Sequence, residues 1–491
     1  MMAKGLRRIS KRFPDYGWSW PTGKLDQLLK AALLPDEDAA CQYAARWLDE
    51  NDIDLVSFRE HRLLAAISDR FGRRLAGHSA YPRLVGLQKM LWTKSRMAMR
   101  EAEPALKAMV DGGADIMLIK GASRIAVNAS AQRGRVAHDI DILVRPRDMT
   151  TVFDILRGRD WQIASGVSPQ YLRTRLPSLR SMNFFKGSFG DIDLHQLGYD
   201  GSQPSAEDDV AIWARAIPAA FSGVSVFVPS PADRMTLAIA HGGLDAHTHS
   251  DWLVDCAVAI HGGDVDWDVF TDIVSRRGIA VAAAVALSYL GLDIGIPVPE
   301  AVLARTVEMA DRAGLSRWSA LLQAKPRTDF GNLVWLSRGF AKQLRLKRKR
   351  GRPRQAPPAS AWRGRLARRK TDVSPASMVF SQIIPCPQAS GDMMLDLTVR
   401  IDVPPVRRRI EMEINAGDDH IARLRAMVIS RSGKERVLRF RGRVTLGGAG
   451  RPLVLEARPS RQFREWDNAG TVAAYGALPF QLLSAEFSPA S

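Results

Sequence analysis

Cysteine is scarce in this sequence of 491 residues. The three cysteines, Cys41, Cys256 and Cys386, lie far apart, and none belongs to a CxxC pair. An odd number of widely separated cysteines supports neither a disulfide framework nor a cysteine zinc site. We therefore expect a protein of the reducing cytoplasm.

Long apolar runs are also missing. The first twenty residues are basic and aromatic and lack the apolar stretch of a signal peptide. The longest apolar run, residues 279–292, is rich in alanine, ends at Asp293 and is too short to cross a bilayer. It predicts a buried helix, and we expect no transmembrane segment.

Acidic residues are absent from one stretch, and this absence accounts for most of the net charge. Between Lys342 and Lys370 there are thirteen Lys and Arg residues and no Asp or Glu. The whole chain carries +18, so the rest of it carries only +5. Such a segment cannot bury a core, and we expect residues 341–372 to form a basic disordered linker. A linker of this charge could bind an anionic surface.

The sequence on either side of the linker has two different periodicities. Helical and strand patterns alternate before it, whereas residues 394–403, 409–414 and later segments alternate as strands with turn residues between them. The patterns predict an α/β (α+β) core followed by a C-terminal antiparallel β-sandwich-like domain. The expected boundaries are a helical segment at 1–83, the core at 84–205, a helical subdomain at 206–340, the linker, and a β-rich domain at 373–491.

A pair of carboxylates carries the first chemical signal. Asp139 and Asp141 stand two apart in an expected strand, so both side chains face the same way. Two carboxylates on one face form half of a site for two divalent cations, as used in phosphoryl and nucleotidyl transfer. The alternative is an acid pair with purely structural hydrogen bonds.

A second strand supplies further polar residues. In the run Asp191–His195, Asp191 and Asp193 share one face. We expect Asp193 to be the third metal ligand, with Asp191 as the competing candidate, and to favour deprotonation of an acceptor hydroxyl. His195 either orients this site or packs in the core.

A possible phosphate-binding turn precedes both strands. Lys120, Gly121 and Ser123 stand at an expected strand-to-helix junction, where glycine permits close backbone approach and helix amides suit a triphosphate. Arg135 stands four residues before Asp139, within reach of phosphate. We predict that these four residues bind the nucleotide, although Lys120 could instead be exposed and Ser123 an ordinary helix hydroxyl.

Three stretches carry a resemblance to a known family: LIKGAS, RVAHDIDILVRPRD and DIDLH. In this order they resemble the bacterial uncharacterised nucleotidyltransferase family of the DNA polymerase beta-type superfamily, over about residues 84–299. The resemblance implies a polymerase-beta-type core with a helical subdomain, Asp139, Asp141 and Asp193 as metal ligands, and Gly121 with Ser123 as the phosphate turn. One departure is that Ala122 separates the usual Gly-Ser pair.

The leading hypothesis is an enzyme that moves a nucleoside monophosphate from an NTP, such as ATP, to a hydroxyl-bearing acceptor with Mg²⁺ or Mn²⁺. The acceptor would be a small molecule, a glycan or a protein. Two alternatives stay open. One is a catalytically inactive scaffold in polysaccharide biosynthesis, which the split turn favours. The other is a nucleic-acid-binding regulator acting through the linker.

Overall fold

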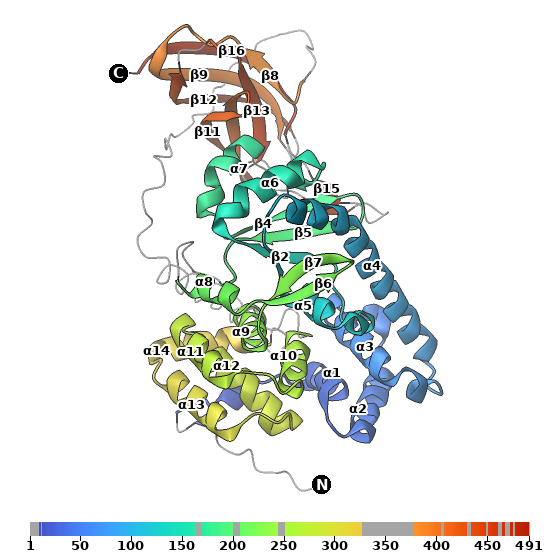
Figure 1. Ribbon diagram of the computed structural model, residues 1–491. Helices are drawn as coiled ribbons and strands as arrows, with labels where there is room; N and C mark the ends of the chain where they lie inside the picture. Colours follow the sequence, from blue (N-terminus) through green and yellow to red (C-terminus); the bar gives the residue numbers. More distant parts are fainter. Residues whose placement is uncertain are drawn as a thin grey trace. The chain divides into compact units, whose positions relative to one another are not determined.

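The structure is a computed structural model. It describes residues 9–10, 12–163, 168–199, 207–243, 251–326, 378–403, 407–429, 434–447, 450–459, 464–466, 472–474 and 477–490. The predicted linker, residues 341–372, lies outside these ranges. The chain divides into two compact units, one of Met1–Asp160 with Phe189–Gly351 and one of Trp161–Ser188 with Arg352–Ser491 (Figure 1). Among the described residues, no helix has the length and apolar character needed to span a membrane.

Four helices begin the first unit: α1 (Gly23–Leu33), α2 (Glu37–Glu50), α3 (Phe58–Phe71) and α4 (Tyr81–Asp111). Helix α3 begins with a capping box. The Ser57 side chain accepts a hydrogen bond from the backbone amide of Glu60, and the Glu60 side chain accepts one from the backbone amide of Ser57. The long α4 contains the helix predicted at 84–109 and ends before Gly112, as expected. Helices α3 and α4 contribute residues to one side of the candidate active site described below.

A mixed sheet forms the centre of this unit. Its strands here are β1 (Ile116–Leu118), β2 (Ile140–Val144), β5 (Gly190–His195), β6 (Ile217–Phe221) and β7 (Val224–Val228), in the order β5-β2-β1-β7-β6. The pairs β2–β5 and β1–β7 are parallel, and β1–β2 and β6–β7 are antiparallel. Helix α4 packs along β5, β7, β1 and β2 (Figure 1).

The hairpin of β6 and β7 was not predicted, because residues from about 208 were expected to be helical. Ser222 and Gly223 have φ angles of +49° and +80°, which form a tight turn between two short strands. Val224, Val226 and Val228 alternate on β7 and are buried. That alternation, next to a Ser-Gly turn, was the overlooked signal.

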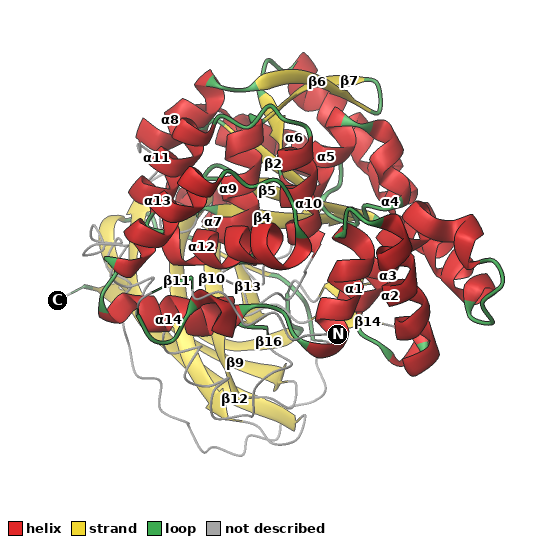
Figure 2. Ribbon diagram, turned by 90° about the horizontal axis from the view of Figure 1, so that it is seen from below, coloured by secondary structure: helices red, strands yellow, loops and turns green. Residues whose placement is uncertain are grey.

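The unit has nine further α-helices among its described residues (Figure 2). They are α5 (Lys120–Val127), α6 (Met149–Gly158), α8 (Glu207–Ala214), α9 (Pro231–Gly242), α10 (Asp251–His261), α11 (Trp267–Arg277), α12 (Ala280–Ser288), α13 (Glu300–Asp311) and α14 (Leu315–Ala324). Every residue of α12 is buried, so the first part of the apolar run at 279–292 is a core helix as predicted, and a π-helical turn at Tyr289–Ile294 follows it. One apolar core joins α1–α3 to α9–α14.

The second unit is mostly antiparallel sheet. It contains β3 (Gln162–Ile163), α7 (Pro169–Arg175) and β4 (Ser181–Lys186), then β8 (Gln382–Ile384), β9 (Ser390–Val403), β10 (Arg407–Ala416), β11 (Asp419–Ile429), β12 (Lys434–Gly447), β13 (Leu453–Pro459), β14 (Arg464–Trp466), β15 (Val472–Ala474) and β16 (Phe480–Pro489). The sheets β11-β10-β13-β8 and β12-β9-β16 share one apolar core. Most of these strands coincide with predicted ones.

Helix α7 is fixed to the larger of these sheets. The amide of Ser168, which caps α7, donates to Glu413 Oε2 at 2.7 Å. The rings of Tyr171 and His420 meet edge to face, with centroids 4.8 Å apart. Burial lowers the pKa of His420 to about 4. Residues 161–188 therefore belong structurally with the C-terminal strands, although they precede them by about 200 residues.

Candidate active site

The parallel pairing of β2 and β5 brings two carboxylates together. Asp141 and Asp193 are register partners, and His195 lies two residues further along β5. His195 Nε2 is 3.2 Å from Asp141 Oδ1 and 2.9 Å from Asp193 Oδ2. One ligand atom from each of these three residues lies within 4.8 Å of the others, close enough to hold a metal ion. Asp193 Oδ1 is buried and has no hydrogen-bond partner among the described residues.

Asp139 lies at the edge of this group. Strand β2 begins at Ile140, one residue later than predicted, so Asp139 is the last residue before the strand. It is not part of the three-residue ligand group found among the described residues. Burial and the nearby charge of Asp141 both raise the pKa of Asp139. Lys120 and Arg62 lower this pKa, but they offset the increase only in part. A cation entering the site would remove this repulsion.

Lys120 supplies the positive charge that balances the carboxylates. Its Nζ donates to Asp141 Oδ1 at 2.5 Å and lies 3.8 Å from Asp193 Oδ2. Burial alone would lower the pKa of Lys120, but Asp141, Asp193 and Asp139 outweigh burial and raise the pKa. Burial would likewise raise the pKa of Asp141, yet Lys120 and His195 hold the pKa of Asp141 below its usual range. The ammonium group occupies a position that a metal ion could take.

The turn at the start of α5 lies where it was predicted, but its residues contact other protein groups. Lys120 has a φ of +53°, a strained backbone at the junction of β1 and α5. Ser123 is buried, and its hydroxyl donates to the Lys120 carbonyl at 2.7 Å. A Cβ atom on Gly121 would lie 3.0 Å from the guanidinium of Arg135. Glycine is therefore needed here for close packing against an arginine.

Arg135 is buried in a network of ion pairs. Its Nε and Nη2 bind both carboxylate oxygens of Asp255 at 2.9–3.1 Å, and its Nη1 lies 2.6 Å from Asp251. Nη1 also donates to the carbonyl of Val136 at 2.7 Å. Burial would lower the pKa of Arg135, but Asp251 and Asp255 raise it well above its usual range. The predicted phosphate ligand is thus already held by two carboxylates.

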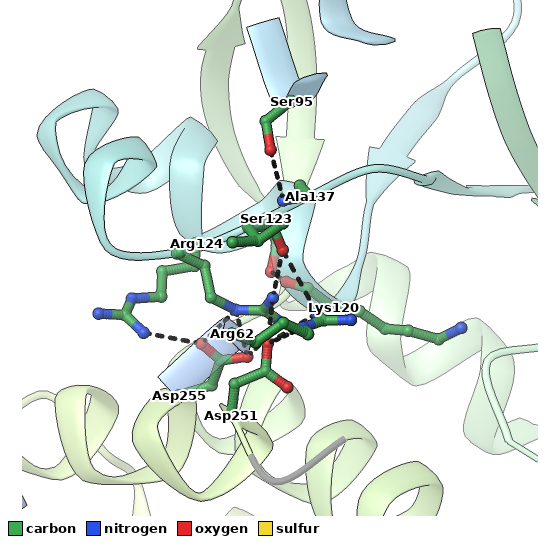
Figure 3. A network of polar contacts seen from close by, with 10 residues as sticks. Arg62, Ser95, Lys120, Ser123, Arg124, Ala137, Asp251 and Asp255 are labelled. Carbon is green, nitrogen blue, oxygen red and sulfur yellow. Dashed lines mark hydrogen bonds and ion pairs between the residues drawn. The ribbon is translucent and has the colours of Figure 1, made fainter. Parts of the chain in front are cut away.

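Four further members of this network were not predicted from the sequence. Arg62 of α3 lies 2.6 Å from Asp251, and Arg124 of α5 lies 3.0 Å from Asp255 (Figure 3). Asp251 and Asp255 stand four residues apart on one face of α10. That spacing was the available sequence signal.

The loop before β2 is also held in place. The Ala137 amide donates to the hydroxyl of Ser95, a fully buried residue of α4, at 3.1 Å (Figure 3). The loop and the helices enclose a cavity of about 120 Å³. Lys120, Gly121, Asp139 and Asp141 line it together with Arg62, Arg135, His241, Asp251, Trp252 and Asp255.

Carboxylates on neighbouring strands lie here beside a lysine–glycine turn and an arginine cluster. Residues 59–292 match the family described as uncharacterised nucleotidyltransferase. The matched region contains all of the predicted site residues and the unpredicted Arg62, Arg124, Asp251 and Asp255. Neither the curated proteins nor the solved structures gave a match to the chain.

Proposed function

We propose that the protein transfers a nucleoside monophosphate from an NTP to a hydroxyl group, with Mg²⁺ or Mn²⁺. The observation that carries this proposal is the register pairing of Asp141 with Asp193, beside Asp139 and the Lys120–Gly121 turn. Carboxylate oxygens are the ligands that Mg²⁺ prefers, and Asp193 has one buried oxygen without a partner among the described residues. The carboxylates of Asp141 and Asp193 therefore fit a divalent cation, and Asp139 would be the third carboxylate ligand.

The reaction places defined demands on these residues. The acceptor oxygen forms a bond to the α-phosphorus, the bond from the α-phosphorus to the bridging oxygen breaks, and pyrophosphate leaves. Asp193 would receive the proton of the acceptor hydroxyl, and Lys120 would turn from Asp141 to the phosphate oxygens. A bound divalent cation supplies charge stabilisation for the phosphoryl oxygens. Gly121 lets the backbone of the turn approach the phosphates.

Titration calorimetry of the full-length protein with ATP, GTP, CTP and UTP tests the proposal. Binding should require Mg²⁺ or Mn²⁺ and should disappear in excess EDTA, because the carboxylates repel a triphosphate without a cation. Asp141→Asn should lose this binding. The matched control is Asp115→Asn, which removes a carboxylate that is paired with Arg145 outside the site. Equal affinity with and without the cation would refute the metal site.

Finer features belong to the same proposal. We place the enzyme in a bacterial cytoplasm, where NTPs are abundant, and we describe its core as polymerase-beta-type. The two antiparallel sheets with one shared core support a β-sandwich at residues 373–491. The boundaries 1–83, 84–205, 206–340 and 341–372 stay part of this proposal.

One observation favours a second candidate, an inactive scaffold. The hydroxyl of Ser123 is bonded to the Lys120 carbonyl, and Arg135 is paired with two carboxylates, so neither is free to hold a phosphate in this state. The scaffold predicts that Asp139→Asn, Asp141→Asn and Asp193→Asn all keep cellular function. Loss of function in these variants, with the protein still folded, would exclude it.

A further inference from the structure

A basic groove runs between α3 and α4, outside the carboxylate site. The end of α3, the 3-10 turn Gly72–Leu75 and one face of α4 form its walls, and its volume is about 660 Å³. Its charged lining residues are Arg70, Arg73, Arg74, Lys89 and Arg133, against Asp69 as the one acidic residue among the described lining. The groove therefore has a strong positive excess, although the folded part of the chain is only mildly basic.

Two of these cations are already bound by other groups of the protein. Arg74 is paired with Glu37 and Asp38, and Arg70 donates to two backbone carbonyls. Arg73, Lys89 and Arg133 are exposed and form no ion pair with any described residue. Unpaired cations that line one concave surface attract an anionic chain.

An aromatic side chain lies among these cations. Trp92 of α4 is 41% exposed and lines the groove one turn after Lys89. Tyr81, near the start of α4, lines the same groove. Bases stack on exposed aromatic rings regardless of sequence, and cations along the groove bind the intervening phosphates. A bilayer surface would instead favour a flat or convex patch, so the shape points to a strand.

The groove leads towards the carboxylate site. Helix α3 carries Arg62, which lines the site cavity, and Asp69, which lines the groove. The two residues are seven apart and share a helix face, which puts them about 10 Å apart along the axis. Arg133 lines the groove and Arg135 lines the cavity, so their Cα atoms are at most about 7.6 Å apart. About three stacked nucleotides would bridge the 10 Å.

We propose that this groove binds a single-stranded nucleic acid and directs its terminal hydroxyl to the carboxylates as the acceptor. This inference rests on the proposed nucleotidyl transfer, since a nucleic-acid end supplies the hydroxyl that the reaction needs. The new bond is a phosphodiester between that hydroxyl oxygen and the α-phosphorus, and pyrophosphate leaves. Acidic glycans and phospholipid surfaces are the competing partners that the experiment separates.

The test measures the fluorescence anisotropy of a labelled 12-nucleotide oligouridylate with the full-length protein across a range of KCl concentrations. Trp92→Ala should weaken binding about 5- to 150-fold, and Trp92→Phe should retain most of it. The double variant Lys89→Gln/Arg133→Gln should reduce the slope of log affinity against log salt by about 1.4. The control Lys107→Gln/Arg305→Gln, which removes two exposed charges outside the groove, should leave the slope unchanged.

All of these variants carry the same basic segment 342–370, so differences between them report on the groove. If Trp92→Ala and Lys89→Gln/Arg133→Gln bind the oligonucleotide like the unaltered protein, the inference is overturned. The same holds if groove variants lose binding to polyglucuronate or anionic vesicles but not to RNA. Calorimetry with Mg²⁺ and NTP separates the two proposals: groove variants should keep NTP binding, and Asp141→Asn should lose it while still binding the oligonucleotide.

Discussion

Asp141 and Asp193 are direct neighbours across the parallel strands β2 and β5, although 52 positions separate them in the sequence. His195 contacts both carboxylates through a single nitrogen. The pairing places the residues with the strongest chemical signal in one buried group.

The first prediction concerns the choice between Asp193 and Asp191 on β5. Asp193→Asn should abolish any transfer activity, because it removes a carboxylate that faces Asp141. Asp191→Asn is the matched control on the same strand face and should keep activity within about tenfold, or about 1.4 kcal/mol of barrier. The measurement is release of pyrophosphate with each NTP. An inactive Asp191→Asn beside an active Asp193→Asn would reverse the assignment.

Lys120→Met should make the stability of the protein depend on a divalent cation. The change leaves Asp141 and Asp193 without their ammonium partner, and breaking a buried ion pair costs about 3–5 kcal/mol. Millimolar Mg²⁺ should recover much of that loss in a thermal unfolding experiment. Lys107→Met, which breaks an exposed pair with Asp111, should change stability by about 0–1 kcal/mol and show no response to Mg²⁺.

Two glycines in helices should respond to alanine in opposite directions. Gly121→Ala should destabilise the protein by about 1–3 kcal/mol, because the new Cβ would meet an Arg135 side chain fixed by Asp251 and Asp255. Gly86→Ala, on α4, has nothing within 4 Å of its added Cβ and should stabilise by about 0.5–1 kcal/mol. Urea unfolding measures both. A stabilising Gly121→Ala would mean that the guanidinium moves freely.

The buried imidazole of His420 should make the second unit sensitive to acid. Burial lowers its pKa to about 4, whereas the unfolded chain takes up the proton near pH 6.5. The unfolded state then binds more protons between these values, so stability is complete above pH 6.5 and falls as the pH drops towards 4. His420→Gln should lessen this fall by about 1–3 kcal/mol, reduced by solvent screening because the ring is partly exposed.

The comparison for His420 uses urea unfolding of both proteins at pH 7.5 and pH 4.5. Other groups titrate in both proteins, so only the difference between them reports on His420. A difference that is the same at both pH values would contradict the burial of a neutral imidazole.

The sequence predicted the candidate site best where the site residues are close together in the chain. The alternation of Asp139, Ile140 and Asp141 predicted a carboxylate strand, and the structure has β2 there with a shift of one residue. Contacts between distant segments could not be predicted in this way. Arg62 and Asp251 are 189 positions apart, and their pairing depends on how α3 and α10 pack in the folded chain.

The other differences between the prediction and the structure have local causes. The β6–β7 hairpin lies between helices, and its short strands gave too little alternation to outweigh the surrounding helical pattern. Ser123 stands where a phosphate-binding hydroxyl was expected, but its hydroxyl donates to the Lys120 carbonyl in the same turn. A side chain that can bond either a ligand or nearby backbone looks the same in a sequence, and only coordinates distinguish the two.

Lys120 has a practical consequence for anyone who purifies the protein. Because the chain carries its own cation between Asp141 and Asp193, the metal-free protein should be a well-folded, soluble reagent that survives chelators and dialysis. A preparation that contains no metal by elemental analysis would then say nothing about whether the enzyme is competent. Screens for activity should add Mg²⁺ or Mn²⁺ together with the nucleotide, so that the triphosphate can draw the lysine away as the ion enters.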